Sequence, residues 1–594
     1  MILDILVYAL VLGGASSCAS FHLNDLQICG SHEDIQPCEY SIISASTGAD
    51  EVEVKAKVKQ LPSLYEADID TLAKGLECNQ FTSVDLVQAY TARIKEVNDK
   101  LRPVTETNPD ALSIASALDE ERVRGVLRGP LHGIPILIKD TIATNDAMNT
   151  TAGSYALLGA KVPHDSTIAL KLRNAGAIIL GKTNPSEWSS FRIFDSANGW
   201  SAYGGQTLGP FFPRQDPSGS SSGSAVGASL GLATVTLGGE TSGSIIDPAS
   251  YNNVVGVKPT VGLTSRNLVI PISERMDTIG PMTKTVRDAA YVLSSIAGFD
   301  PRDNYTSAIP DDADMDFLGA CRREALRGAR LGVPRNVIRL MAQSDKSNST
   351  WSMVQVFDEA LSTLRSLGAH IIEKIDTDFP AAQSFLNEPS LSAQIMGADF
   401  IINLETYLSQ LTTNPNNITS LSILRTWIQE SPLECYPNKS TEVWDAALAN
   451  WNNTTPEFWD AYMRGVYYGD EGGLLGTIRR NHLDAVILPS HIAWDWAGIV
   501  GAPVVGVPLG AMPPGQNVIK NQEGIVQAAP GIPFGLSFLG AKFSDAKLIG
   551  LAYAFEQHTM VRDTVRPYIM PRTDLAGMVG RKGENNERDG SRAR

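Results

Sequence analysis

The chain has 594 residues, of which 43% are hydrophobic and 19% charged, a composition typical of a globular protein rather than a disordered one. That length can bury one large core or two to four smaller ones. The formal net charge of −16 excludes the basic surface that binds a phosphate backbone, so we expect no nucleic-acid partner. No cysteine or histidine cluster has metal-ligand spacing, so no metal is predicted.

The first 19 residues resemble a signal peptide. An apolar run over residues 6–12 is followed by small residues over 15–20, where a signal peptidase could cleave. The run is too short to cross a bilayer. Asp4, with no lysine or arginine beside it, is atypical of a signal, and an ordinary N-terminal segment is the alternative. We therefore expect a signal peptide over 1–19, an N-terminal extension over 20–63 and a secreted protein.

Cysteine and asparagine usage agrees with secretion. Five cysteines remain after cleavage, an odd number, so at least one is predicted to be free. Acceptor tripeptides for N-glycans crowd between residues 304 and 453. We predict glycans at some of the following residues: Asn304, Asn348, Asn417, Asn438, and Asn452 or Asn453. A homodimer is compatible with this sequence.

Helices and strands are predicted in alternation after residue 64. Thr82 and Asp85 form a loose capping box at the start of an amphipathic helix. Apolar runs behind glycine or proline predict strands at 134–138, 177–180, 233–237, 331–333, 371–372 and 485–488. Intervening helices are predicted over 166–175, 286–297, 352–367 and 545–557. This alternation favours an α/β architecture with a largely parallel sheet covered on both faces.

The strand pattern fades between about 380 and 470. Four tryptophans accumulate there: Trp427, Trp444, Trp451 and Trp459. The segment is predicted to be a helical insertion, which either roofs a pocket or forms surface helices with a few core aromatics. From residue 571 the chain is polar and charged, which predicts a disordered tail over 571–594.

Three residues in glycine-rich segments form a candidate acyl-transfer set. Lys139 ends the strand-like run GIPILIKD, Ser220 lies in SGSSSGSA, and Ser244 lies in GGETSGSI. A lysine that loses its proton, a serine that passes a proton and a serine that attacks a carbonyl need neither histidine nor metal. Ser220 precedes a predicted helix and Ser244 follows a predicted strand, positions that active-site residues commonly occupy.

Two competing motifs are rejected. Segment 176–183 matches the P-loop pattern, but its middle residues are apolar and strand-like instead of forming an open loop. Segment 219–223 matches the GxSxG elbow, but prolines precede it where that elbow needs a buried strand. A Ser-His-Asp hydrolase also needs a well-placed histidine, and none is singled out. His132, beside the Lys139 strand, is predicted to be a packed structural residue.

The order of motifs resembles the amidase signature family of serine amidohydrolases. The similarity runs from about residue 64 to 566. It includes GPLHGIPILIKD (129–140), GKTNPSEW (181–188), SGSSSGSAVGASLGLATVTLGGETSGSI (218–245), VVGVKPTVGLTSR (254–266), DTIGPMTKTVRDAA (277–290) and GIPFGLSFLG (531–540). The resemblance implies an α/β/α sandwich around a large mixed β-sheet, in a domain over 64–570. It also implies a small-molecule amide as substrate and no cofactor.

A role for each site residue follows from the same resemblance. Lys139 corresponds to the family's catalytic lysine, Ser220 to its bridging serine with an unusual cis peptide bond, and Ser244 to its nucleophile. Because a lysine acts as a base only when neutral, burial would have to lower its pKa from about 10.4 toward 7–8. The resemblance also implies that the backbone N–H groups of Thr241, Ser242 and Gly243 form an oxyanion hole. Ser221 corresponds to a serine that forms a hydrogen bond with the lysine.

Several positions near this set depart from the family's pattern. Ser218, Ser222 and Ser242 stand where most members have glycine, so strain is expected in the oxyanion loop. Ile246 and Glu240 stand where members often have arginine and aspartate. Three alternatives to an amidase therefore stay open: an esterase with the same triad, a catalytically impaired relative, and a glutamine-amidotransferase subunit that would need a partner.

Overall fold

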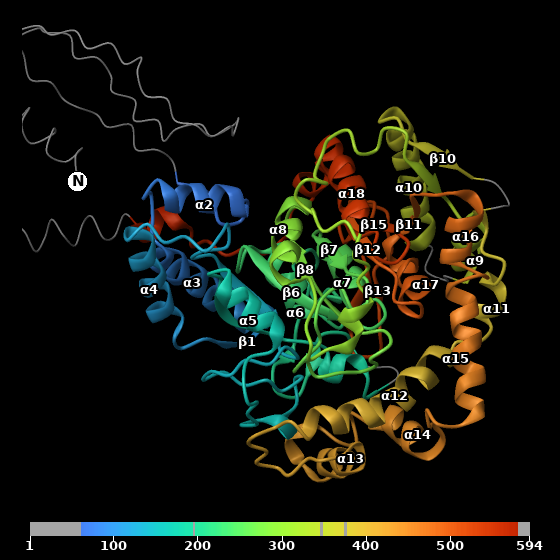
Figure 1. Ribbon diagram of the computed structural model, residues 1–594, viewed down its shortest axis with the longest axis horizontal. Coiled ribbons are helices and arrows are strands. Elements are labelled where there is room, and N and C mark those ends of the chain that lie inside the picture. Colours follow the sequence, from blue (N-terminus) through green and yellow to red (C-terminus); the bar gives the residue numbers. More distant parts are fainter. Residues whose placement is uncertain (1–60, 194–196, 345–348, 374–376, 580–594) are drawn as a thin grey trace, which may run out of the picture. The chain divides into compact units, whose positions relative to one another are not determined.

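The computed structural model describes residues 61–193, 197–344, 349–373 and 377–579 (Figure 1). The predicted signal peptide over 1–19, the extension up to residue 60, the acceptor Asn348 and the tail beyond residue 579 lie outside these residues. None of the helices in the described ranges combines the length and the apolar character that a bilayer crossing needs.

An eleven-stranded sheet forms the centre of the described residues, in the order β1-β3-β2-β6-β8-β7-β12-β15-β11-β9-β10. Its strands are β1 (Val104–Thr107), β2 (Pro135–Lys139), β3 (Ile178–Thr183), β6 (Val235–Glu240), β7 (Val255–Lys258), β8 (Thr278–Thr283), β9 (Arg330–Gly332), β10 (His370–Ile372), β11 (Ala485–Pro489), β12 (Val504–Ala511) and β15 (Pro533–Leu539). Four two- or three-residue strands pair outside it: β4 (Trp200–Ser201) with β5 (Gly205–Gln206), and β13 (Ile519–Lys520) with β14 (Val526–Ala528).

Strand direction changes across this sheet. Strand β2 is parallel to β3 and β6, and β9 is parallel to β10 and β11. The neighbours from β6 through β8, β7, β12 and β15 to β11 are antiparallel. The largely parallel sheet predicted from the alternating pattern is therefore wrong, because that pattern missed the glycine- and proline-containing strands in the middle. The mixed sheet that the resemblance implied is confirmed.

Helices cover both faces of the sheet. On one face α6 and α7 pack against the central strands, with α3 beside α6; on the other lie α5, α8, α10 and α18. The helices outside the insertion are α2 (Ile69–Glu77), α3 (Ser83–Leu101), α4 (Ala111–Val123), α5 (Thr167–Asn174), α6 (Ser222–Ser229), α7 (Ile246–Tyr251), α8 (Val286–Ile296), α9 (Arg335–Ser344), α10 (Ser349–Ser366), α16 (Leu474–Asn481), α17 (Trp494–Gly498) and α18 (Asp545–Thr559). The capping box of Thr82 and Asp85 is present at the start of α3.

Strand β2 shows why the lysine lies in the interior. Its five residues are all buried. Ile136 and Ile138 belong to one hydrophobic cluster with residues of α5 and α8, whereas Leu137 belongs to another with residues of α3 and α6. A strand buried on both faces reads as a continuous apolar run. Lys139 ends that run and is therefore held inside the protein.

The segment predicted as a helical insertion is helical. It contains α11 (Ala382–Leu386), α12 (Leu391–Leu408), α13 (Leu421–Glu430), α14 (Glu442–Asn450) and α15 (Pro456–Gly469), and α12 packs against α13, α14 and α15 (Figure 1). Trp444 is fully buried and its indole N–H donates to the carbonyl of Phe191 at 2.5 Å. Trp459 is 44% exposed. The insertion thus supplies both core and surface aromatics, and α12 also lines the cavities described below.

The start of the predicted disordered tail is ordered. Leu575 is fully buried, and the carboxylate of Glu96 on α3 accepts the backbone N–H groups of Arg572 and Thr573. Arg93 also donates to the carbonyl of Thr573 at 2.5 Å. The prediction of disorder is therefore wrong for residues 571–579, because charged groups on α3 supply the partners that this polar segment needs.

Secretion stays a prediction, but the structure places three of the cysteines and five of the predicted glycan acceptors. Cys78 is disulfide-bonded, whereas Cys321 and Cys435 are free thiols, which agrees with the prediction of at least one free cysteine. Of the predicted acceptors within the described residues, Asn453 is half-buried. The other four are exposed: Asn304, Asn417, Asn438 and Asn452. Glycosylation of these asparagines, like the homodimer, stays a prediction.

Candidate active site

Lys139, Ser220 and Ser244 come together where β2 and β6 end. Lys139 is the last residue of β2, Ser220 precedes α6, and Ser244 lies between β6 and α7. The two serine loops are joined directly, since the N–H of Ser221 donates to the carbonyl of Ser244 at 3.1 Å. The peptide bond between Gly219 and Ser220 is cis, as the resemblance implied.

The amine of Lys139 contacts the hydroxyl of Ser220. Lys139 Nζ lies 2.8 Å from Ser220 Oγ in a hydrogen bond and donates to the carbonyl of Gly239 at 3.0 Å. The lysine is 1% exposed. Burial lowers the pKa of Lys139 to about 7, although the charges of Asp277 and Glu240 oppose this effect. A substantial fraction of the amine is therefore neutral near pH 7, as a lysine base requires.

Ser221 contacts the backbone of Gly239 instead of Lys139. Its hydroxyl donates to the carbonyl of Gly239 at 3.1 Å and accepts the N–H of the same residue at 3.2 Å. The Gly239 carbonyl is also the acceptor for Lys139. The direct bond from Ser221 to the lysine that the resemblance implied is thus replaced by a shared acceptor, which the register of β6 places between the two side chains.

The loop before Ser244 presents backbone N–H groups. Among the described residues no acceptor pairs with the N–H groups of Thr241, Ser242 or Gly243. All three residues line the cavity of Ser244 described below. The carboxylate of Glu240 accepts the N–H groups of the two residues after Ser244, at 2.7 and 2.9 Å, and this holds the turn closed.

The serines that replace glycines have different consequences. Ser242 does not adopt a positive φ, whereas Gly243 does, at 84°, so the strain expected from serine in the oxyanion loop is absent there. Ser218 does adopt a positive φ, of 58°. Its hydroxyl donates to Asp247 at 2.7 Å, and the hydroxyl of Ser222 donates to the Ser218 carbonyl at 2.5 Å. These two hydrogen bonds therefore stabilise the loop that carries Ser220.

Two cavities meet at this site. Ser244 lines a cavity of about 330 Å³, to which α12 of the insertion contributes Ser392 and Met396. Lys139 lines a second cavity of about 350 Å³. Ser189, Thr241 and Ile272 line both. The volumes lie at the small end of the range for small-molecule sites.

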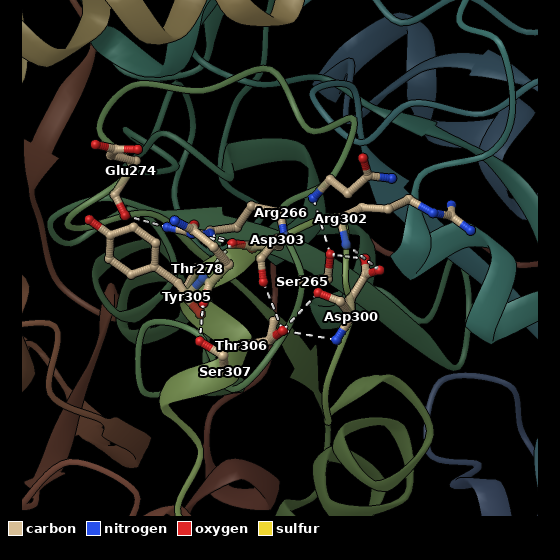
Figure 2. A network of polar contacts seen from close by, with 12 residues as sticks. Ser265, Arg266, Glu274, Thr278, Asp300, Arg302, Asp303, Tyr305, Thr306 and Ser307 are labelled. Atoms are coloured by element: carbon tan, nitrogen blue, oxygen red, sulfur yellow. Dashed lines mark hydrogen bonds and ion pairs between the residues drawn. The ribbon is translucent and has the colours of Figure 1, made fainter.

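A polar network forms one wall of the second cavity (Figure 2). The guanidinium of Arg266 forms two hydrogen bonds to the carboxylate of Asp303, at 2.6 and 2.8 Å, and lies 4.3 Å from the ring centre of Tyr305. Arg266 ends one of the motifs in the sequence, yet the motif predicts no role for it. Its partner is 37 residues away and follows no local pattern.

A second group of residues, which no sequence motif predicted, stabilises the turn that carries Ser189 and Ser190. Arg192 is 1% exposed and bonds Glu187 at 2.5 Å and Glu434 of the insertion at 3.1 Å. It adjoins a turn in which Trp188, Ser189 and Ser190 have positive φ. Non-glycine residues rarely adopt this conformation, so surrounding contacts must hold the turn. Ser189 and Ser190 line the cavity of Ser244.

Comparisons with known proteins agree with this geometry. The amidase family model matches residues 85–549. A putative amidase of Arthroderma benhamiae is 46% identical, over 95% of this chain and 97% of its own. The peptide amidase of Stenotrophomonas maltophilia superimposes with a TM-score of 0.74 at 35% identity, covering 86% of this chain and 99% of its own.

The amidotransferase subunits match a smaller part of the chain. One such glutamyl-tRNA(Gln) amidotransferase subunit, from Chloroflexus aurantiacus, is 38% identical, but over only 53% of this chain and 61% of its own. The amidase of Arthroderma benhamiae matches nearly end to end, and the family model covers most of the chain. The protein therefore belongs to the amidase family and is an amide hydrolase.

Proposed function

We propose that the protein cleaves a carboxylic amide through an acyl-enzyme on Ser244, with Ser220 and Lys139 as the proton relay. The observation that carries this proposal is the buried contact of 2.8 Å between Lys139 Nζ and Ser220 Oγ, at a lysine whose pKa is lowered to about 7. A buried, neutral lysine is the base that such chemistry needs.

In the acylation half, Ser244 Oγ attacks the carbonyl carbon of the amide. The Ser244 proton moves to Ser220 Oγ as the Ser220 proton moves to Lys139 Nζ, so the relay ends with a lysine cation. The N–H groups of the loop over 241–243 stabilise the negative charge that develops on the carbonyl oxygen. Each such donor is worth about 2.7–4 kcal/mol in the transition state.

Collapse of the tetrahedral intermediate breaks the carbon–nitrogen bond. Because an amide nitrogen leaves poorly unless it is protonated, the proton held on Lys139 returns through Ser220 to the departing amine. Water then attacks the acyl-enzyme with the same relay acting as base, and the acid leaves with Ser244 restored. The hydroxyls of Ser244 and Ser220 share no hydrogen bond among the described contacts, and we expect that bond to form when substrate binds.

A fluorophosphonate probe tests the nucleophile. It should label the wild-type protein on Ser244, and Ser244→Ala should abolish labelling; the neighbouring Ser242→Ala variant is the matched control and should still be labelled. Equal labelling of wild type and Ser244→Ala would refute the assignment. No labelling and no amide hydrolysis by a correctly folded wild type would instead indicate a catalytically impaired relative.

The role of the lysine is tested by comparing an amide with its matched ester. An alkoxide leaves without full protonation, so Lys139→Ala should reduce amide hydrolysis at least about ten-fold more than ester hydrolysis. An equal loss on both substrates would argue against proton donation by Lys139. The same comparison on wild type decides whether the protein prefers amides or esters.

A further inference from the structure

Two carboxylic acids share the cavity of the proposed nucleophile. Asp247, at the start of α7, and Asp495, on α17, line the same cavity of about 330 Å³ as Ser244. They are 248 positions apart in sequence, so only the fold brings them to one cavity. The lining that the described residues provide contains no lysine, arginine or histidine.

Each acid is held by the hydroxyl of a serine. Ser218 Oγ donates to Asp247 Oδ2 at 2.7 Å, and Ser242 Oγ donates to Asp495 Oδ1 at 3.0 Å. A glycine at either position could not make these bonds. The two hydrogen bonds therefore have a common consequence, which is to fix a carboxyl group beside the cavity.

Each carboxyl also keeps one oxygen without a protein donor. Asp247 Oδ1 is buried and has no hydrogen-bond partner within the described residues. Asp495 Oδ2 accepts no described hydrogen bond either. A buried acceptor without a donor costs about 1–3 kcal/mol, so Asp247 favours any donor that reaches its free oxygen, whereas Asp495 is half-buried and does not carry that cost.

The pKa values of both acids are raised. Burial, followed by the charges of Asp216, Glu240 and Asp495, raises the pKa of Asp247 to about 7. Burial likewise raises the pKa of Asp495 to about 7. The effect of Asp495 on Asp247 agrees with their placement around one cavity, where like charges oppose ionisation and a bound cation would relieve that opposition.

We infer that the protein acts on amides that carry an ammonium group a few carbons from the scissile carbonyl, with Asp247 and Asp495 binding that group. This inference rests on the proposed function, because it names the substrate class for the same cavity. An ammonium has three donors and no acceptor, which suits a cavity that is lined by two carboxyl groups and, within the described residues, by no basic side chain. The same pair disfavours substrates that carry a carboxylate.

Three amides matched in chain length measure this preference: 4-aminobutanamide, pentanamide and glutaramic acid. They place an ammonium, a methyl and a carboxylate at the same distance from the amide. The assay is run at about pH 8.5, where both acids are ionised and the aliphatic ammonium is kept. We expect kcat/KM to be about ten-fold higher for 4-aminobutanamide than for pentanamide, and lowest for glutaramic acid.

Isosteric variants assign the preference to the two acids. Asp247→Asn and Asp495→Asn should each move the ratio of 4-aminobutanamide to pentanamide toward one. Glu405→Gln removes the same charge from the exposed part of α12, outside this cavity, and should leave the ratio unchanged. Equal kcat/KM for the three amides in wild type, or a ratio that neither variant alters, would overturn the inference.

A binding measurement separates this inference from the proposed function. Calorimetry with butylammonium and with butyrate on the Ser244→Ala protein requires no turnover. Binding of butylammonium alone, lost in Asp495→Asn, supports the charge preference even if no amide is cleaved. Hydrolysis of pentanamide together with indifference to charge would retain the proposed function and refute the inference.

Discussion

The hydroxyl of Thr241 donates a 2.6 Å hydrogen bond to Asp277, which connects the loop before Ser244 to the wall of the cavity that reaches Lys139. Asp277 also accepts the N–H groups of Ile272 and Ser273, at 2.8 and 3.1 Å. Its charge raises the pKa of Lys139 against the larger effect of burial. One carboxylate thus affects both the position of the loop before Ser244 and the protonation of Lys139.

Replacing Asp277 should separate these two effects. In Asp277→Asn the pKa of Lys139 is expected to fall further, because the charge that raises it is gone, so the acid limb of kcat/KM should move to lower pH. Thr241→Val removes the hydrogen bond but keeps the charge, and should lower kcat without moving the acid limb. A pH profile of amide hydrolysis for both variants is the measurement. An unmoved limb in Asp277→Asn would contradict this prediction.

The activity of the wild-type enzyme should rise with pH through about 7. The relay requires neutral Lys139, whose pKa is about 7, so kcat/KM for an amide should be low well below pH 7 and reach a plateau above it. The measurement is kcat/KM from pH 5 to about 9 on a substrate that does not itself titrate. A profile that is flat across neutral pH would show that Lys139 is not the group whose protonation controls the reaction.

The buried lysine should also lower stability. Its pKa is near 7 when folded and about 10.4 when unfolded, so between these values the unfolded chain binds more protons and stability rises with pH. The cost is complete below about pH 7 and amounts to roughly 5 kcal/mol. Lys139→Met should therefore raise Tm most below pH 7, with a gain that shrinks as the pH approaches 10. Tm as a function of pH for both proteins tests this, and a gain independent of pH would contradict it.

Ser218 combines an unfavourable backbone conformation with a favourable hydrogen bond. Its φ of 58° costs roughly 1 kcal/mol in any residue but glycine, whereas its bond to Asp247 is worth about 1.5–3 kcal/mol. Ser218→Ala loses the bond and keeps the strain, while Ser218→Gly loses both. We therefore expect Ser218→Gly to be about 1 kcal/mol more stable than Ser218→Ala by urea denaturation. Equal stability of the two variants would mean that the strain is negligible.

Arg192 should be among the residues that contribute most to the stability of the protein where the insertion packs. It bonds Glu187 and Glu434 in the interior, and its removal leaves two carboxylates buried without their cation. Arg192→Met should cost about 3–5 kcal/mol in the free energy of unfolding. The double variant with Glu434→Gln should recover part of that loss, because it removes one of the stranded charges. Denaturant titration measures both, and a single variant with wild-type stability would refute the role.

The local elements were predictable because they depend on neighbours in sequence. Strand β2 and helix α18 follow from apolar runs and periodicity, and the start of α3 from its capping box. The strands in the middle of the sheet were not predicted, since β8 and β15 contain the glycine or proline that usually interrupts a strand. Their antiparallel pairing is decided by partners far along the chain.

The sequence by itself determined which groups are proposed to carry the chemistry: Lys139 at the end of a buried run, and Ser220 and Ser244 in their glycine-rich loops. Only the tertiary structure decided how these groups behave. The pKa of Lys139 depends on its burial, and the charge beside Ser244 depends on Asp495, which lies 251 positions away. The physical reason is that side-chain identity is local, whereas desolvation and charge–charge interaction depend on every atom that folding brings near.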